Sequence, residues 1–182
     1  MDLRKLDNTL QSGLVTRYHA VPSVRPQTVG QHTWGVAILM HYLSDGRATV
    51  HMILEALLHD SAEYFTGDVP FTVKRDNPAI KMAFDTLEEI HRENDLVPNA
   101  GYEGLNHEQA LLKLCDTLEG FLWCAQYEAR LGPVGPRWEE AYYRCKTKFV
   151  DILDTAYPGI WGRAEEIFRS FQNINRNTTN SP

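Results

Sequence analysis

Residues 54–70 read LEALLHDSAEYFTGDVP. The apolar residues at the start of this stretch favour a buried helix, yet two ionisable side chains, His59 and Asp60, follow them directly. A buried charged group is costly unless it has a partner of opposite charge. A divalent cation is such a partner, because imidazole nitrogen and carboxylate oxygen are both good ligands for zinc, cobalt, manganese or magnesium. The stretch therefore predicts a buried helix with metal ligands near its end.

Two more ionisable residues lie in apolar helical stretches elsewhere in the chain. His32 lies in TVGQHTWGVA, and Asp116 lies in LLKLCDTLEGFLW. A lone helical histidine is more often a core residue, and a lone aspartate is more often a helix cap or a solvated residue. Asp60, however, sits late in its helix, where the macrodipole disfavours a carboxylate, and the neighbours of Asp116 are too apolar for a solvated face. We predict that four residues bind one catalytic metal ion: His32, His59, Asp60 and Asp116.

Two further carboxylates, Glu63 and Asp68, follow this histidine–aspartate pair. On a continuous helix, Glu63 projects from the same face as His59, while Asp60 is rotated by about 100°. Each carboxylate could donate a proton to a leaving group, act as a base toward water, or bind a second metal ion. The sequence does not choose among these roles. It also leaves open the plainer alternatives, a surface helix residue for Glu63 and a turn residue for Asp68.

The ordered set of histidines and aspartates resembles a known signature. It is similar to the H…HD…D pattern of the HD-domain metal-dependent phosphohydrolases, with the following residues in the pattern: His32, His59, Asp60 and Asp116. Glu63 and the sequence TGDVP at 66–70 resemble the matching segment of the small bacterial 5'-deoxynucleotidases. An isolated HD dipeptide carries little information, but the ordered set with its intervals is specific.

The N-terminal part of the chain extends the resemblance. Arg17-Tyr18 is similar to the arginine–aromatic pair that precedes the first metal histidine in the 5'-deoxynucleotidases. The stretch RYHAVPSVRPQTVGQHTWGVA at 17–37 looks closer to phage-encoded HD-domain dATP triphosphohydrolases. In all, the likeness covers roughly residues 14 to 130.

The resemblance implies an enzyme that hydrolyses a deoxynucleotide at the α-phosphorus and releases the deoxynucleoside. The leading prediction is a dATP triphosphohydrolase, which cleaves dATP to deoxyadenosine and triphosphate and so depletes dATP. The alternative is a 5'-deoxynucleotidase that acts on dNMPs. A third hypothesis, from another class, is a non-catalytic HD module that senses a nucleotide. Such a module is expected to have lost ligands, whereas this chain keeps all four metal positions and both auxiliary carboxylates.

A substrate phosphate needs cationic partners close to the metal ion. Arg17 matches the family position, and its planar guanidinium can bind a phosphate in a bidentate manner. Lys74, six residues after Asp68, is a second candidate for phosphate binding, although a lysine after a turn is often only solvated. Tyr18 could stack on the sugar or base of the nucleotide. We therefore predict Arg17, Tyr18 and Lys74 as substrate-binding residues.

Composition limits the class of partner. The chain has 182 residues, 43% of them hydrophobic, which is enough for the core of one domain. A net charge of −6 argues against binding of a nucleic-acid polymer but is compatible with a small nucleotide bound through local cations and a metal ion. The family resemblance implies that this partner is a deoxynucleotide. Three cysteines without a CxxC motif indicate reduced thiols. With no apolar run near the roughly 20 residues that span a bilayer, we expect a cytoplasmic protein without a membrane partner, in the host cytoplasm if phage-encoded.

Helical periodicity dominates the chain, so we predict an all-α fold. The family resemblance implies that this fold is a single HD-domain helical bundle. Residues 1–172 form the expected domain, and the polar stretch 173–182 is an expected disordered tail. Prolines in the segment 17–27 predict an irregular loop there. The expected helices cover residues 3–12, 28–44, 49–65, 77–95, 107–131, 137–155 and 158–172.

The aromatic residues suggest a core and an interface. Trp34, Phe121 and Trp123 recur near helical spacing and are predicted core residues. The family resemblance implies a homo-oligomer. Apolar residues late in the chain are candidates for its interface: Trp138, Tyr142, Tyr143 and Trp161.

Overall fold

A computed structural model describes residues 3–17, 25–69, 71–92, 106–128 and 135–178. Within these ranges the regular secondary structure is helical apart from one two-stranded sheet, which confirms the predicted all-α class. The elements are α1 (Leu3–Ser12), β1 (Thr16–Arg17), β2 (Gln27–Thr28), α2 (Val29–Leu43), α3 (Val50–Leu58), α4 (Glu63–Thr66), α5 (Phe71–Asp76), α6 (Pro78–Arg92), α7 (His107–Glu128), α8 (Gly135–Ala156) and α9 (Ile160–Thr178).

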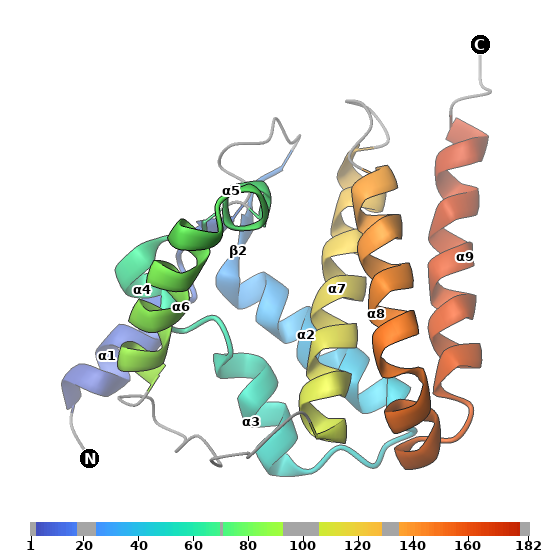
Figure 1. Cartoon of the computed structure of the whole chain (residues 1–182), viewed down its shortest axis with the longest axis horizontal. Helices are drawn as coiled ribbons and strands as arrows, with labels where there is room; N and C mark the ends of the chain where they lie inside the picture. The colour runs from blue at the N-terminus through green and yellow to red at the C-terminus, as the bar shows by residue number, and fades with distance from the viewer. Residues whose placement is uncertain (1–2, 18–24, 70, 93–105, 129–134, 179–182) are drawn as a thin grey trace.

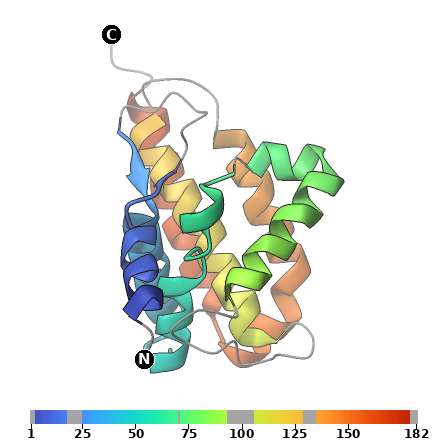
Figure 2. The same ribbon diagram turned by 90° about the vertical axis from the view of Figure 1, so that its left-hand side faces the viewer.

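Helix α7 is the centre of the bundle. It packs against α2, α3, α8 and α9, and Figure 1 shows α7, α8 and α9 running side by side. The shorter helices α1, α4, α5 and α6 form a second group in Figure 1, in which α4 packs against α1 and α6, and α5 packs against α6. In the turned view of Figure 2, α1 and α6 lie on either side of α4. The metal ligands predicted from the sequence belong to α2, α7 and the segment after α3, so they lie where these two groups of helices meet.

Apolar side chains of α2, α7, α8 and α9 fill the core. Its largest fully buried members include Leu43, Leu118, Tyr142 and Phe168. Tyr142 stacks on Phe168 with ring centroids 4.3 Å apart. Burial of each such side chain contributes about 1.5–3 kcal/mol to the free energy of unfolding. This core holds α7 rigidly against α2 and so fixes the relative positions of the polar residues that these two helices carry.

Two threonines set the starts of the helices that lead to the site. Thr28 caps α2: its hydroxyl accepts a hydrogen bond from the Gln31 backbone N–H at 3.2 Å, and the Gln31 side chain accepts one from the Thr28 N–H at 3.0 Å. Thr49 caps α3 in the same position. These caps satisfy backbone donors of the first turn that lack partners within the helix. The first cap lies one turn before His32.

The single helix predicted for residues 49–65 is wrong. α3 ends at Leu58, and α4 begins only at Glu63. Between them the backbone N–H of Ser61 donates to the carbonyl of Leu58 at 2.9 Å, and that of Glu63 donates to the carbonyl of Asp60 at 3.0 Å. A hydrogen-bond spacing of three residues tightens the turn relative to an α-helix. The metal-ligand candidates after α3 therefore sit on a turn between two helices.

Other expectations need smaller corrections. The ends of the predicted loop 17–27 pair as strands, with Thr16 opposite Thr28 and Arg17 opposite Gln27. α5 was not predicted. α9 continues to Thr178, past the predicted end at 172, so the helix takes in part of the expected disordered tail. Among the described residues, none of the helices is both long and apolar enough to cross a bilayer.

Several aromatic predictions are also corrected. Trp34 is 64% exposed and does not belong to the core, because it lies on the outer face of α2, whereas Phe121 is buried as predicted. Tyr142 and Trp161 are buried within the subunit and so are not free to form an interface, while Tyr143 is exposed.

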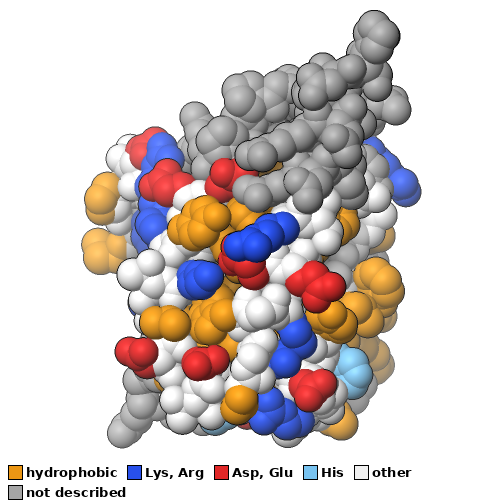
Figure 3. Space-filling view, turned by 90° about the vertical axis from the view of Figure 1, so that its right-hand side faces the viewer, with side chains coloured by type: hydrophobic (Ala, Val, Ile, Leu, Met, Phe, Trp, Pro, Cys, Tyr) orange, Lys and Arg blue, Asp and Glu red, His pale blue; other side chains and the backbone are white. Residues whose placement is uncertain are grey.

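Figure 3 shows the side of the molecule that α9 borders in Figure 1, where acidic, basic and apolar side chains are interspersed.

Candidate metal centre

Three parts of the chain bring their polar side chains together between α2 and α7. α2 contributes His32, the turn after α3 contributes His59 and Asp60, and α7 contributes Asp116. One possible ligand atom from each of His32, His59 and Asp60 lies within 4.8 Å of the others. Asp116 joins this group through His32, whose Nε2 is 3.3 Å from its Oδ1. All four residues predicted as metal ligands are therefore brought to one place.

His32 is fully buried, and its two ring nitrogens face different partners. Nδ1 contacts a carboxylate oxygen of Glu119. Nε2 points toward the other candidate ligands and lies 3.6 Å from Oδ2 of Asp60. It makes no hydrogen bond within the described residues, although it is buried. A buried imidazole nitrogen in this position is suited to bind a metal ion, because its lone pair has no competing donor.

His59 also places a ring nitrogen beside Asp60. Its Nδ1 lies 2.8 Å from the carbonyl oxygen of Ala56. Because a carbonyl only accepts hydrogen bonds, Nδ1 carries a proton, so in the neutral ring the lone pair is on Nε2. Nε2 lies 3.3 Å from Oδ1 of Asp60. The ring centroids of His32 and His59 are 5.3 Å apart, so both imidazoles flank the same small space.

Cationic side chains hold the two aspartates from outside. Arg17 is only 8% exposed, and its Nη1 donates to Oδ2 of Asp60 at 3.1 Å. Lys113, one turn before Asp116 on α7, donates to Oδ2 of Asp116 at 2.6 Å. The sequence predicted Arg17 as a phosphate-binding residue, not as a partner of Asp60, and Lys113 was not predicted at all. The sequence does contain a signal for Lys113. It lies three residues before Asp116, and residues at this spacing on a helix lie on the same face.

The local charges set the protonation states. Burial and the charge of Arg17 disfavour a charged His32, but its contacts with the carboxylates of Asp116 and Glu119 and the charge of Asp60 outweigh them and raise the pKa of His32 to about 9. Burial raises the pKa of Asp60, but the charges of His59, Arg17 and His32 more than offset it and lower that pKa. The metal-free site thus holds ionised aspartates against a protonated imidazole. A divalent cation can displace the imidazole proton and bind between the same groups.

Glu63 lies beside this group as the first residue of α4 and is 8% exposed. Its Oε2 is buried without a hydrogen-bond partner among the described residues. Burial raises the pKa of Glu63 to about 9, helped by the negative charges of Asp60 and Asp68. Asp68 is therefore near enough to influence Glu63, and it follows Gly67, whose φ of 67° ends α4 in a conformation that suits glycine. Both predicted auxiliary carboxylates lie near the centre.

Tyr18 and Lys74 were also predicted as substrate-binding residues. Tyr18 lies outside the described residues. Lys74, on α5, donates to Oε1 of Glu88 on α6 at 2.5 Å, with both side chains largely buried. Its charge still reaches Glu63, where it lowers the pKa slightly against the dominant effect of burial. The structure thus assigns Lys74 an ion-pair partner that the sequence did not predict.

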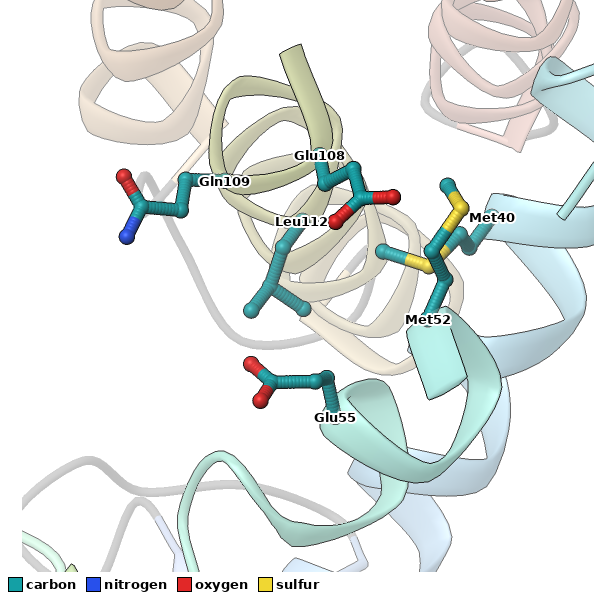
Figure 4. A pocket seen from close by; sticks show the side chains of 6 residues that line it. All are labelled: Met40, Met52, Glu55, Glu108, Gln109 and Leu112. Atoms are coloured by element: carbon teal, nitrogen blue, oxygen red, sulfur yellow. The ribbon is translucent and has the colours of Figure 1, made fainter. Parts of the chain in front are cut away.

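A small pocket lies one turn away from the ligands, between α3 and α7. Figure 4 shows its lining residues, with the carboxylates of Glu55 and Glu108 turned toward the gap. Glu55 lies four residues before His59, and Leu112 lies four residues before Asp116. The pocket is therefore adjacent to the candidate metal centre but contains none of its ligands. Its lining residues are Met40, Met52, Glu55, Glu108, Gln109 and Leu112.

The helical bundle and its two histidines and two aspartates define the class of the HD-domain phosphohydrolases. The chain belongs to the YfbR-like 5'-deoxynucleotidase family, whose model matches residues 9–155. This confirms the family resemblance predicted from the sequence. Curated relatives include the 5'-deoxynucleotidase YfbR of Salmonella arizonae, 29% identical over 136 residues, and a 5'-deoxynucleotidase of Klebsiella pneumoniae, 29% identical over 133 residues. Each match covers 62% of this chain and 67% of the relative.

Two solved structures share the fold. One is the cyanophage S-2L HD phosphohydrolase DatZ bound to dA and one catalytic Zn²⁺ ion, with a TM-score of 0.63 and 22% identity, covering 94% of this chain and 96% of that chain. The other is the PH0347 protein of Pyrococcus horikoshii OT3, with a TM-score of 0.62 and 18% identity, covering 92% of this chain and 99% of that chain. The fold therefore extends over nearly the whole length of both.

Proposed function

We propose that the protein is a metal-dependent phosphohydrolase that cleaves a deoxynucleotide at the α-phosphorus and releases the deoxynucleoside. The observation that supports this most is the meeting of four candidate ligands from three separate segments: His32, His59, Asp60 and Asp116. Two imidazole nitrogens and two carboxylates suit zinc, cobalt, manganese or magnesium. The buried Nε2 of His32, which has no hydrogen bond within the described residues, fits a metal ligand better than a structural histidine.

A divalent cation held by these residues would lower the pKa of a bound water and draw charge from the phosphorus. The protein side chains supply the remaining requirements. Arg17, already 3.1 Å from Asp60, is positioned to bind a phosphate oxygen beside the metal ligands. Lys113 provides a second positive charge next to Asp116. Tyr18 remains a prediction for the base or sugar, and Lys74 would have to leave Glu88 to reach a phosphate.

Glu63 and Asp68 are the groups available for proton transfer. We assign Glu63 as the donor to the leaving 5'-oxygen, because it is buried beside Asp60 and its raised pKa keeps it protonated at neutral pH. The negative charge of Asp68 then helps to keep the pKa of Glu63 raised. The other role left open by the sequence is a second metal site formed by Glu63 and Asp68, with a cation brought in by a triphosphate substrate. Metal stoichiometry separates the two roles.

For the substrate, dATP is the leading candidate, with deoxyadenosine and triphosphate as products and depletion of dATP as the role. This choice rests on the resemblance of residues 17–37 to the phage dATP triphosphohydrolases. The nearly full-length fold match to DatZ, a protein bound to dA, supports deoxyadenosine as a product, which either dATP or dAMP would release. The second candidate is a 5'-deoxynucleotidase acting on dNMPs, which is favoured by the family model and the curated relatives. Both share the same metal chemistry and differ in the phosphorus product.

The test is to incubate the metal-loaded protein separately with dATP, dGTP, dAMP and dGMP and to identify the phosphorus product by chromatography. Triphosphate from dATP, with dAMP untouched, supports the triphosphohydrolase. Orthophosphate from dAMP, with dATP inert, assigns the protein to the 5'-deoxynucleotidases. Binding of a nucleotide without turnover of any of the four would favour the non-catalytic HD module instead.

A further inference from the structure

A buried chain of polar contacts leads from the small sheet to the candidate metal centre. Gln27, on β2, donates from Nε2 to Oε1 of Glu119 at 2.7 Å. The second carboxylate oxygen of Glu119 contacts Nδ1 of His32. Gln27 and His32 are both fully buried, and Glu119 is 8% exposed. The three residues come from β2, α7 and α2, so this contact chain forms only when these elements are packed together.

The helical structure of α7 alone does not explain why Glu119 is buried. It lies in the apolar stretch of α7 three residues after Asp116, and a buried carboxylate is costly without partners. Both of its oxygens are occupied, one by Gln27 and one by His32. A carboxylate on Nδ1 keeps the proton on that nitrogen and leaves the Nε2 lone pair for the space shared with Asp60 and Asp116.

The packing of α2 makes room for this carboxylate. A Cβ atom at Gly35 would lie 3.1 Å from Oε1 and 2.8 Å from Cγ of Glu119, and the second of these distances is shorter than real Cβ contacts. Gly35 is one turn after His32, on the side of α2 that faces α7. The absence of a side chain at this position therefore lets Glu119 lie against α2 and reach the imidazole.

We propose that Glu119, held in place by Gln27, is a positioning residue that fixes the orientation and tautomer of His32 for metal binding. Neither residue touches the reacting atoms in this assignment. Glu119 acts through the imidazole, and Gln27 acts through Glu119. The inference rests on the proposed function in one respect, namely that His32 is a metal ligand.

Four variants separate positioning from simple structural support. Glu119→Leu removes both acceptors at similar size. Glu119→Gln keeps the shape: its amide oxygen can accept from Nδ1 of His32, and its amide nitrogen can donate to Oε1 of Gln27, which has no hydrogen-bond partner among the described residues. Gln27→Leu removes only the outer contact. Glu165→Leu is the matched control, because Glu165 is a largely buried carboxylate that accepts from Tyr142 and Lys146 in the contact between α8 and α9.

The measurement is Co²⁺ titration of the metal-free full-length proteins, followed through the visible absorption of the bound ion, together with thermal unfolding of each metal-free protein. Loss of a group that orients a metal-bound histidine typically weakens metal binding about 10- to 100-fold. We expect this loss in Glu119→Leu with an altered Co²⁺ spectrum, a smaller loss in Gln27→Leu, and a wild-type spectrum in Glu119→Gln. Glu165→Leu should bind Co²⁺ as the wild type does, even if it melts earlier.

The inference is overturned if Glu119→Leu binds Co²⁺ with wild-type affinity and spectrum, whether or not its melting temperature falls. It is also overturned if Glu119→Gln loses as much affinity as Glu119→Leu while it remains folded. Failure of the proposed metal centre would look different, because the wild type itself would then bind Co²⁺ no more tightly than His32→Ala does. The wild-type titration therefore separates the two failures.

Discussion

Arg17 and Gln27 lie directly opposite each other across the antiparallel pair of β1 and β2. Side chains at opposed positions project from the same face of a sheet, and here both are buried. Arg17 reaches Asp60 on one side of the centre, and Gln27 reaches Glu119 on the other. This short sheet thus carries Arg17, which contacts the candidate ligand Asp60. It also carries Gln27, which supports the candidate ligand His32 through Glu119.

Replacement of Arg17 tests phosphate binding. Arg17→Ala should lower kcat/KM for the deoxynucleotide about 10- to 100-fold, since a hydrogen bond to a charged group contributes about 1.5–3 kcal/mol. Arg17→Lys should recover only part of this, because an ammonium lacks the bidentate geometry of guanidinium. Steady-state kinetics of both variants provide the check. Equal kcat/KM in wild type and Arg17→Ala would remove Arg17 from the substrate site.

Lys113 should contribute a weaker, screened effect. Its side chain is 62% exposed, so Lys113→Met is expected to lower kcat/KM by no more than about fivefold. The loss should shrink as salt is added, since exposed charges are screened within about 10 Å at 0.1 M salt. Lys81→Met is the control, because Lys81 pairs with Asp85 on the exposed face of α6. Similar losses in both variants would assign the effect to net charge alone.

Glu63 should be needed for turnover but not for binding of the first metal ion. Removal of a proton-transfer group typically costs about 100- to 10,000-fold in rate. Glu63→Gln keeps the size of the side chain and should show this loss in kcat, with metal content per subunit equal to that of the wild type. Metal analysis alongside kinetics makes the test. A variant that loses one of two bound metal ions would identify Glu63 as a ligand to a second metal.

The metal-free protein should lose stability as the pH rises from 6.5 to 9. His32 and Glu63 both have pKa values raised to about 9, from ordinary values of 6.5 and 4.5. Between the ordinary and the raised pKa the folded protein binds more protons than the unfolded chain, so increasing pH favours unfolding. The lowered pKa values of Asp60 and Asp116 act only as the pH falls toward 3.8 and below.

Thermal unfolding in the presence of a chelator measures this dependence. Glu63→Gln should unfold at a less pH-dependent temperature than the wild type between pH 6.5 and 9, because the Glu63 contribution is then absent and the His32 contribution remains. A wild-type melting temperature that rises over this pH range would contradict the assigned protonation states.

Much of this architecture was predictable from local patterns. The helices at Leu3–Ser12 and Val29–Leu43 follow from periodicity and from the Thr28 cap. The four candidate ligands were recognisable because ionisable residues in apolar stretches are unusual. The turn at His59 was not predictable, since its three-residue hydrogen-bond spacing depends on how the segment packs between α3 and α4.

The remaining features depend on contacts between distant segments. A glutamate on a helix is ordinarily solvated, and only the packing of α2 on α7 reveals that Glu119 is buried against His32. The pairing of Lys74 with Glu88 requires α5, which periodicity did not predict. Trp34 has the apolar character of a core residue, but its position on the outer face of α2 decides its exposure.

The most direct test of the account is the Asp60→Ala variant, with Glu55→Ala as the matched control on the preceding turn of α3. Metal content and deoxynucleoside release would be measured for both, with circular dichroism to verify the helical fold. We predict that Asp60→Ala remains folded, loses bound metal and releases no deoxynucleoside from dATP or dAMP, while Glu55→Ala behaves as the wild type. Unchanged turnover and metal content in Asp60→Ala would contradict the metal assignment.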